Sequence, residues 1–310
     1  MIVLRASFTG FIFALFTSVS YANIVFDGRF SNGDFSTYRA VETDGISVEG
    51  AAVANGIPNR LERVLDPAGS GKWVGLTELH TGDARTHGGR RSEISAFVDP
   101  VGSERWYSWG YYLPETWEYG KGDTVIAQIH SVHDKGESGW RNPPLAFFVT
   151  EGELRLVNAY DSDDITSPLG RKPIAGLDFE RRELTSWQAE PETWTYLDLH
   201  VKWAADNTGF LELWKDGVLL FQEENQANTF DDEAGVWFKN GIYDVASSSE
   251  FISAYSTGVL IGDEKETFQS MSMSVAPEPS TYLMMMAGLA SIGLLVSMRT
   301  GISKQAEFNT

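Results

Sequence analysis

Residues 125–133 read VIAQIHSVH. β-branched side chains dominate this stretch, which predicts a β-strand. Side chains alternate between the two faces of a strand, so we expect Val125, Ala127 and Ile129 on one apolar face. The opposite face then mixes apolar and polar residues: Ile126, Gln128, His130 and Val132. Gln and His here occupy strand positions that would otherwise be expected to carry buried apolar residues. Such a strand lies at a sheet edge or lines a site, and we predict that it lines a site.

The composition favours one large β-domain with an aromatic-lined groove. The chain has 310 residues, and about 250 remain once two terminal segments are set aside, enough for one sizeable core. Ten Trp, 18 Phe, 11 Tyr and 30 Gly suit many strands and turns. The absence of cysteine excludes disulfides and Cys-ligated zinc. The net charge of -19 argues against nucleic acid as a partner, and an anionic substrate would need a locally basic cleft or a bound cation.

Residues 1–22 have the organisation of a secretory signal peptide. Arg5 supplies a positive charge, residues 11–16 form a short apolar run, and Ser20-Tyr21-Ala22 fits a small-x-small cleavage site. The alternative, an N-terminal membrane helix, fits less well because the apolar run is short. We therefore expect an exported domain that begins at residue 23.

The C-terminal segment is more specific. Pro277-Glu278-Pro279 precedes an apolar, charge-free run, and a single Arg299 follows that run. This arrangement resembles the PEP-CTERM sorting signal of Gram-negative bacteria, which an exosortase-type enzyme processes. The resemblance implies a domain at residues 23–270, a tail at 271–310 and transient membrane association through residues 282–298, with the protein in the periplasm, at the cell surface or outside the cell. The alternative is an ordinary C-terminal anchor.

The middle of the chain reads as a succession of antiparallel strands. We expect strands at 23–27, 60–65, 90–98, 106–113, 124–133, 145–150, 153–160, 194–203, 209–214, 218–222, 235–244 and 258–263. Residues 161–190 are polar and poorly periodic, and we interpret them as a loop that could form a flap. No helical period persists between residues 23 and 270, which predicts an all-β sandwich of the jelly-roll type, concanavalin-like, with a concave cleft.

Three short motifs lie in order along this domain: Arg91-Ser92-Glu93-Ile94, Gln128-Ile129-His130 and Trp237-Phe238-Lys239-Asn240-Gly241-Ile242-Tyr243. Together they resemble the jelly-roll polysaccharide lyases, which include alginate lyases, glucuronan lyases and a heparin-lyase-like family. The resemblance spans roughly residues 85–245. Alginate lyases usually carry Gln two residues after the tyrosine, where this chain has Val245. This departure leaves a glucuronan-like substrate open.

The resemblance implies β-elimination on a uronate polysaccharide. Arg91 and Gln128 would neutralise the uronate carboxylate, whose charge otherwise opposes removal of the neighbouring proton. Tyr243 would serve as base, as acid or as both, and His130 could share the role of base. Lys239 shares a strand face with Tyr243 at about 13 Å, too far for both to touch one carboxylate, so we assign Lys239 to a neighbouring uronate. The remaining candidates for substrate binding are Glu93, Arg90, His87 and Trp237.

Several of these residues have a simpler interpretation. Arg91 and Glu93 could pair across a strand face, and Tyr243 alone would pass for a half-buried sheet tyrosine. His200 and Lys202 are expected at the convex face or rim. Asp161, Asp163 and Asp164 could hold a structural calcium ion, although an acidic loop is more often solvated. We expect no catalytic metal and a monomer, with an anionic polysaccharide as substrate.

Two other functions compete with the lyase. A glycoside hydrolase on the same sandwich needs two closely placed carboxylates, commonly as Glu-x-Asp-x-x-Glu on one strand, and no such strand occurs. A non-catalytic carbohydrate-binding or adhesion module would explain the aromatic residues and the anchoring. It would not explain why Arg91, Gln128, His130 and Tyr243 occur together.

Overall fold

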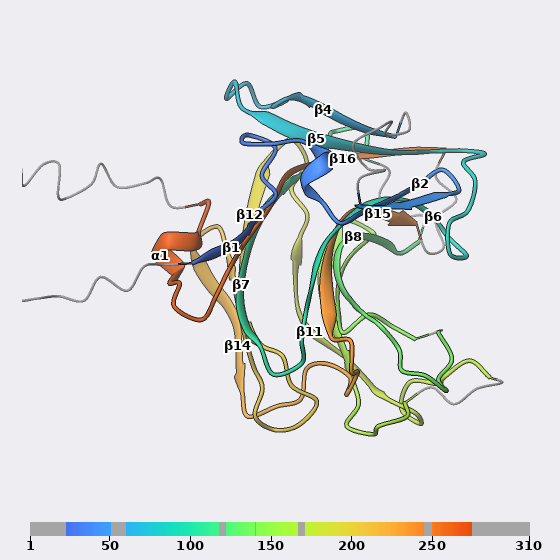
Figure 1. Cartoon of the computed structure of the whole chain (residues 1–310). Helices are drawn as coiled ribbons and strands as arrows, with labels where there is room; N and C mark the ends of the chain where they lie inside the picture. Colours follow the sequence, from blue (N-terminus) through green and yellow to red (C-terminus); the bar gives the residue numbers. More distant parts are fainter. Residues whose placement is uncertain are drawn as a thin grey trace, which may run out of the picture.

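The structure is a computed structural model that describes residues 23–50, 60–117, 122–139, 141–166, 171–244 and 250–274. Two antiparallel sheets pack face to face (Figure 1). Sheet A has the order β14 (Val218–Glu224), β13 (Phe210–Lys215), β12 (Trp194–Lys202), β7 (Glu104–Tyr112), β16 (Phe251–Gly262), β5 (Trp73–His80) and β4 (Leu61–Leu65), with β1 (Ile24–Asp27) also paired to β16. Sheet B has the order β11 (Glu180–Gln188), β10 (Glu153–Tyr160), β9 (Leu145–Thr150), β8 (Thr124–Ser131), β15 (Val236–Asp244), β6 (Arg90–Asp99), β2 (Ala40–Thr43) and β3 (Ile46–Glu49). The short helical segments are η1 (Phe35–Thr37) and α1 (Phe268–Met271).

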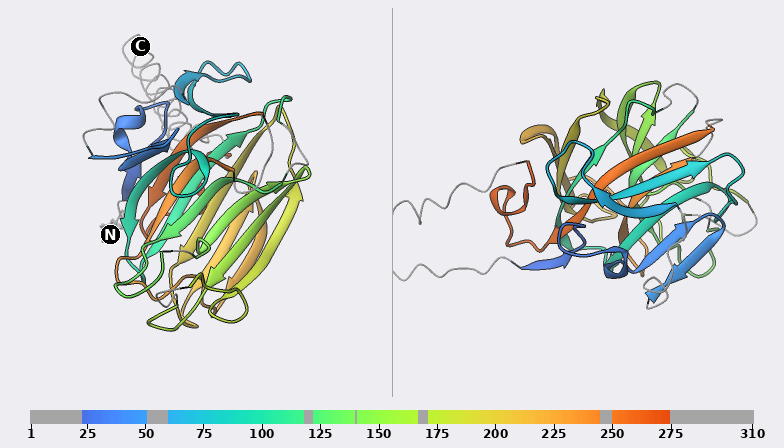
Figure 2. Two further views of the ribbon diagram at one scale, coloured as in Figure 1. Left: turned by 90° about the vertical axis from the view of Figure 1, so that its right-hand side faces the viewer. Right: turned by 90° about the horizontal axis from the view of Figure 1, so that it is seen from above.

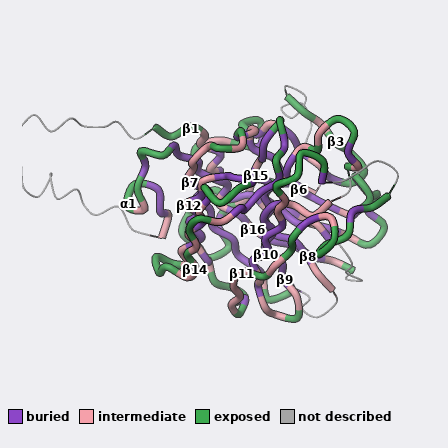
Figure 3. The backbone as a smooth tube through the Cα atoms, turned by 90° about the horizontal axis from the view of Figure 1, so that it is seen from below, coloured by how far each residue is buried: buried purple, intermediate pink, exposed green. Residues whose placement is uncertain are grey.

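The core lies between the two sheets and is built from aromatic rings. Trp109 of β7 packs edge-on against Phe147 of β9 at 5.2 Å and against Phe238 of β15 at 5.1 Å between ring centroids. Trp203 and Tyr107 extend this layer from sheet A. The two further views in Figure 2 show the strands running side by side in layers, and in Figure 3 the inner parts of the strands are buried. The predicted all-β jelly roll is therefore confirmed.

Some strand predictions need correction. Residues 180–188, expected in a loop, form β11 at the edge of sheet B. No strand was predicted at residues 73–80, where β5 lies, and the last strand begins at Phe251 rather than at 258. β11 escaped notice because its side chains are mostly half-buried or exposed, so it lacks the apolar alternation that reveals an inner strand.

The strand at 124–131 departs from simple alternation. A register shift lies between Val125 and Ala127 where β8 pairs with β9. Ile126 consequently belongs to the core with Ala127 and Ile129, whereas Val125 packs on the other face beside Tyr243. The expected positions of Val125 and Ile126 were thus exchanged, because a β-bulge inserts a residue and resets the alternation. Gln128 and His130 lie beyond the bulge and face away from the core.

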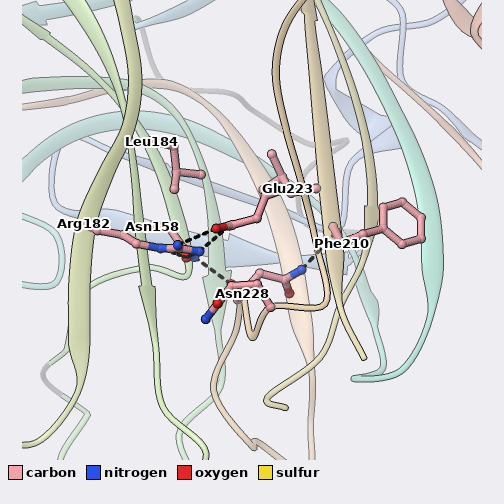
Figure 4. Close-up of a pocket in the computed structure, with 8 residues that line it drawn as sticks. Asn158, Arg182, Leu184, Phe210, Glu223 and Asn228 are labelled. Carbon is pink, nitrogen blue, oxygen red and sulfur yellow. Dashed lines mark hydrogen bonds and ion pairs between the residues drawn. The ribbon is translucent and has the colours of Figure 1, made fainter. Parts of the chain in front are cut away.

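An ion pair joins the edge strands of the two sheets. Arg182 of β11 reaches Glu223 of β14 with two hydrogen bonds of 2.7 and 2.5 Å (Figure 4). Asn158 donates to the carbonyl oxygens of Pro144 and Asn228. The pocket in Figure 4 is therefore a polar seam that closes one edge of the sandwich.

The predicted signal peptide and the apolar segment 282–298 lie outside the described residues. Within the part that the structure describes, no helix is long and apolar enough to cross a membrane. The described chain continues past residue 270. Met271 is buried, and the hydroxyl of Ser272 donates to Asp198 of β12 at 2.6 Å.

Candidate active site

A cleft of about 590 Å³ opens on the outer face of sheet B. β15 pairs with β8 on one side and with β6 on the other, so the three sequence motifs lie on neighbouring strands. Residues that line the cleft are Glu42, His87, Gly88, Arg91, Gln128, His130, Ser131, Val132, His133, Gly139, Arg141, Pro143, Trp237, Lys239 and Tyr243. All four predicted catalytic residues are among them.

The strand register places these side chains in opposed pairs. Gln128 of β8 lies opposite Lys239 of β15, and His130 lies opposite Trp237. On the other side of β15, Tyr243 lies opposite Arg91 of β6. A second bulge, between Asn240 and Tyr243, brings Tyr243 level with Val125. Gln128 and His130 therefore lie on one side of the central strand, and Arg91 lies on the other.

Four charged groups form a compact network at the cleft floor. Lys239 Nζ lies 2.8 Å from Glu42 Oε2 and 2.8 Å from Glu93 Oε2. Arg91 Nη1 contacts the same two oxygens at 3.1 and 3.2 Å. Gln128 Nε2 donates to the other oxygen of Glu93 at 2.5 Å. Each charge thus has two opposite partners, which a buried ionic group needs to offset its loss of water.

Glu42 is a cleft residue that the sequence did not reveal. It lies on the four-residue strand β2, where Val41 points into the core and Glu42 pairs with Glu93 in register. Burial raises the pKa of Glu42, but the charge and hydrogen bond of Lys239 and the charge of Arg91 outweigh it and hold this pKa at about 2. Glu42 and Glu93 balance the formal charges of Arg91 and Lys239. The floor of the cleft is therefore balanced in formal charge and is not locally basic.

His130 is arranged as a neutral base. Its Nδ1 lies 2.8 Å from the carbonyl oxygen of Ser131, so Nδ1 carries the proton and Nε2 keeps its lone pair. Burial, reinforced by the charge of Lys239, lowers the pKa of His130 to about 4. Trp237 packs beside the imidazole at 4.9 Å between ring centroids. A histidine held in this way is uncharged at neutral pH and can accept a proton through Nε2.

Tyr243 is set against Arg91. The guanidinium carbon of Arg91 lies 4.0 Å from the centroid of the Tyr243 ring, within the range of a cation–π contact. Gly89 makes this position possible, since a Cβ there would lie 2.1 Å from the tyrosine ring. The phenol is half-buried and lines the cleft, and the positive charge of Arg91 lies over its ring.

The predicted binding residues divide into three groups. His87 and Trp237 line the cleft, and His87 Nε2 lies 3.9 Å from Glu42 Oε1. Lys239 also lines it, but its side chain is 2% exposed and its ammonium group is already paired twice. Glu93 is 1% exposed and lies beneath the floor as the acceptor for three neighbours. Arg90 is not a lining residue, because strand alternation turns it away from Arg91 towards Asp244 and the carbonyl of His80.

Arg141 is a second cleft residue that was not predicted. Its side chain is 3% exposed and forms ion pairs with Glu137, at 2.9 Å, and with Asp232. It also donates to the hydroxyl of Ser131 at 3.2 Å. Because the Ser131 carbonyl fixes the proton of His130, Arg141 connects two loops to the end of the strand that carries His130.

Metal binding finds no support in the described ranges. These residues contain no group of three or more His, Asp or Glu side chains placed to hold an ion. Asp161, Asp163 and Asp164 are therefore not gathered into such a group. Val245, on which the comparison with alginate lyases turned, lies outside the described residues.

The fold is a jelly roll, and its cleft on sheet B brings together arginine, glutamine, histidine and tyrosine side chains from the three sequence motifs. The polysaccharide lyase family profile matches residues 30–259, and the chain belongs to this family. It is a polysaccharide lyase, as the sequence motifs predicted. Residues 275–299 match the PEP-CTERM protein-sorting motif, which indicates export through an exosortase system of Gram-negative bacteria.

Solved structures with the same fold include two lyases. An endo-β-1,4-glucuronan lyase from the fungus Trichoderma reesei aligns with a TM-score of 0.59 and 18% identity, over 83% of this chain and 99% of that chain. An alginate lyase from Pseudomonas aeruginosa aligns with a TM-score of 0.50 and 13% identity, over 74% of this chain and all (100%) of that chain. A comparison with curated protein sequences finds no match. At such identities the likeness concerns the fold.

Proposed function

We propose that this lyase cleaves a uronate-containing polysaccharide, glucuronan-like or alginate-like, by β-elimination. The observation that carries the proposal is the position of Arg91, Gln128, His130 and Tyr243 around one cleft, with His130 neutral and its Nε2 available. The glucuronan and alginate lyases of the same fold agree with such a substrate class.

The uronate carboxylate is held by Gln128 and Arg91. One N–H of the Gln128 amide is bound to Glu93, so the second N–H remains for a substrate oxygen. Arg91 uses Nη1 for its two glutamates, and its buried Nε has no hydrogen-bond partner. Donors at the carboxylate disperse the negative charge that develops when the α-proton leaves, which lowers the barrier most in a site shielded from water.

The elimination requires one base and one acid. The base takes the proton from C5, the electron pair forms the C4=C5 double bond, and the bond from C4 to the leaving oxygen breaks. The leaving oxygen then takes a proton from the acid. His130 Nε2 is assigned to the C5 proton and the Tyr243 hydroxyl to the leaving oxygen, and such transfers contribute about a hundred- to ten-thousand-fold each.

Hydrolysis is less well supported by the same cleft. Glu42 and Glu93 are close carboxylates, as a glycoside hydrolase needs. Both are ion-paired with Lys239 and Arg91, and Glu93 is buried beneath the floor. Neither is therefore free to act as proton donor or nucleophile.

Absorbance measurements on polyuronates test the proposal. The purified protein should produce a rise in ultraviolet absorbance from the new unsaturated uronate with at least one of glucuronan, polymannuronate, polyguluronate or an unsulfated glycosaminoglycan. Tyr243→Phe should abolish this rise while polymer binding remains. Tyr255→Phe is the matched control, because Tyr255 lies on sheet A against Tyr112.

Two results would contradict the proposal. One is the release of reducing ends from a neutral glucan without any absorbance change, which would favour a hydrolase. The other is full turnover by Tyr243→Phe, which would remove the tyrosine from the chemistry.

A further inference from the structure

The described chain ends on the face of the molecule that is opposite to the cleft. The cleft lies on the outer face of sheet B, whereas α1 and the residues after it pack on the outer face of sheet A. Met271 is buried there against Trp106 and Leu260, and the backbone N–H of Met273 donates to the Ser108 hydroxyl at 3.3 Å. Figure 1 shows α1 on the outer side of the layer formed by β7, β12 and β14.

Exposed apolar side chains flank this terminal segment on two sides. Val218 is 69% exposed and Leu219 is 44% exposed, both at the start of β14. They follow Gly217, at which a Cβ would lie 3.5 Å from the Ser274 hydroxyl. On the other side, Ile24 of β1 is 43% exposed.

Ile24 is tied to the terminal segment through β16. It pairs with Gly262, at which a Cβ would lie 2.8 Å from the sulfur of Met271. Figures 1 and 2 show β1 and α1 at the same side of the molecule, and the first two residues of β1 are exposed. The apolar residues on both flanks thus surround the point where the described chain ends.

The sequence leaves little chain between this point and the apolar run of the tail. Seven residues separate Ser274 from Tyr282, and the eight steps along the chain span at most about 28 Å when fully extended. A domain of about 250 residues has a radius of gyration of about 18 Å and hence a diameter of roughly 45 Å. A membrane that holds the apolar run is therefore within reach of the face around α1 and out of reach of the cleft.

We propose that the face formed by β1, α1 and the β13–β14 hairpin lies against the lipid surface while the sorting tail is in the membrane, so that the substrate cleft opens away from it. The inference rests on membrane insertion of the tail and is independent of the proposed reaction. Apolar side chains at the rim of this face suit the interfacial region of a bilayer. A polysaccharide outside the membrane would then reach the cleft without obstruction.

Single-cysteine fluorescence tests this orientation, because the chain has no cysteine of its own. Val218→Cys and Ile24→Cys report on the proposed membrane face. Leu177→Cys is the matched control, since Leu177 is 73% exposed and lies between β10 and β11 of sheet B. Lys135→Cys reports on the loop beside the cleft residue His133.

Each full-length variant is labelled with a small fluorophore and inserted into phosphatidylcholine vesicles that contain lipids with a nitroxide near the headgroup. We expect loss of fluorescence at positions 218 and 24 and unchanged fluorescence at 177 and 135. Equal loss at all four positions, or greater loss at 177 or 135, would overturn the orientation. Absence of quenching at every position would also overturn it, because the tail would then not hold this face at the bilayer. Lyase activity is measured separately, so its failure leaves these results interpretable.

Discussion

The two outer faces of the sandwich each carry a partly covered histidine, and the two residues are held in opposite ways. His200 of sheet A has both ring nitrogens near carboxylates, Nε2 at 2.9 Å from Glu104 and Nδ1 at 3.0 Å from Glu212. It also stacks on Trp106 with ring centroids 4.0 Å apart. His130 of sheet B uses one nitrogen for a backbone carbonyl and keeps the other open to the cleft. We therefore predict a structural role for His200, whose two ring nitrogens are both paired, and a chemical role for His130, which uses only Nδ1.

The same contrast applies to the other polar groups on these faces. Asp198 of sheet A accepts from Ser108 and from Ser272, both at 2.6 Å, and is fully covered. In the cleft, Gln128 and Arg91 are each fixed by Glu93, yet each keeps a donor that this contact does not use: the second amide N–H of Gln128 and the buried Nε of Arg91. Prepositioned donors of this kind are ready to meet a charge that arrives with a substrate.

The largest expected effect comes from replacing each histidine in turn: one variant should lose catalytic activity, and the other should lose stability. His130→Asn should lower kcat/KM by about a hundred- to ten-thousand-fold, because the general base is lost. His200→Asn should leave turnover near that of the wild type and lower the melting temperature, because Glu104 and Glu212 lose their shared partner. Steady-state kinetics and thermal unfolding on both variants provide the measurement. Comparable loss of activity in the two variants would contradict the division of roles.

The two glutamates of the cleft network should differ in their contribution to folding. Glu93→Gln should reduce the free energy of unfolding by about 3–5 kcal/mol, because Arg91 and Lys239 lose a fully buried counter-ion. Glu42 has a side chain that is 15% exposed, so water can partly replace it, and Glu42→Gln should cost less. Urea denaturation compares the two. A larger loss for Glu42→Gln would show that the exposed edge of the network governs its stability.

Local sequence patterns predicted the strands that carry the motifs. They did not predict how these strands pair or which residues of other elements contact the motifs. Gln128, His130, Lys239 and Tyr243 could be placed on one sheet face because strand alternation holds over short distances. The exchange of Val125 and Ile126 was missed because the bulge depends on how β8 pairs with its neighbours. Alternation could have excluded Arg90 once Arg91 was assigned to the cleft.

Glu42 and Arg141 were missed for a different reason. Glu42 precedes its partner Glu93 by 51 positions and lies on a strand of four residues, too short to show a clear period. Arg141 lies in a loop and reaches Asp232 across 91 positions. Pairing at such separations is set by the topology of the whole sheet, which single motifs do not encode. The segment around Glu42 also carries Arg39 and Asp44, so no local signal distinguished Glu42 from a solvated charge.

The pH dependence of activity should follow from the depressed pKa of His130. The base works in its neutral form, and its pKa of about 4 lies below the ordinary 6.5. Activity should therefore persist as the pH falls through 6.5 and decline only as it falls through about 4. The acid limb of kcat/KM reports the free enzyme and measures this directly. An acid limb near 6.5 would mean that burial and Lys239 do not hold His130 neutral.

The smallest expected effect concerns the contact behind His130. Ser131→Ala removes the hydroxyl that accepts a hydrogen bond from Arg141. It leaves the backbone carbonyl that fixes the proton on the imidazole of His130. Loss of one hydrogen bond of about 0.5–1.5 kcal/mol should lower kcat by about two- to tenfold with little change in KM. Ser186→Ala on β11 is the matched control, because its hydroxyl bonds Glu153 away from the cleft.

The pH profile then distinguishes positioning from general loosening of the fold. If Arg141 and Ser131 hold the strand end that carries His130, Ser131→Ala should also displace the acid limb of kcat/KM, and Ser186→Ala should not. The backbone carbonyl of residue 131 is present in the wild type and in Ser131→Ala. A displaced acid limb would therefore arise from an altered position of this carbonyl and not from its removal. Equal kcat and an unchanged acid limb in Ser131→Ala would show that backbone pairing of β8 with β15, through Ser131 and Val236, suffices to orient the imidazole.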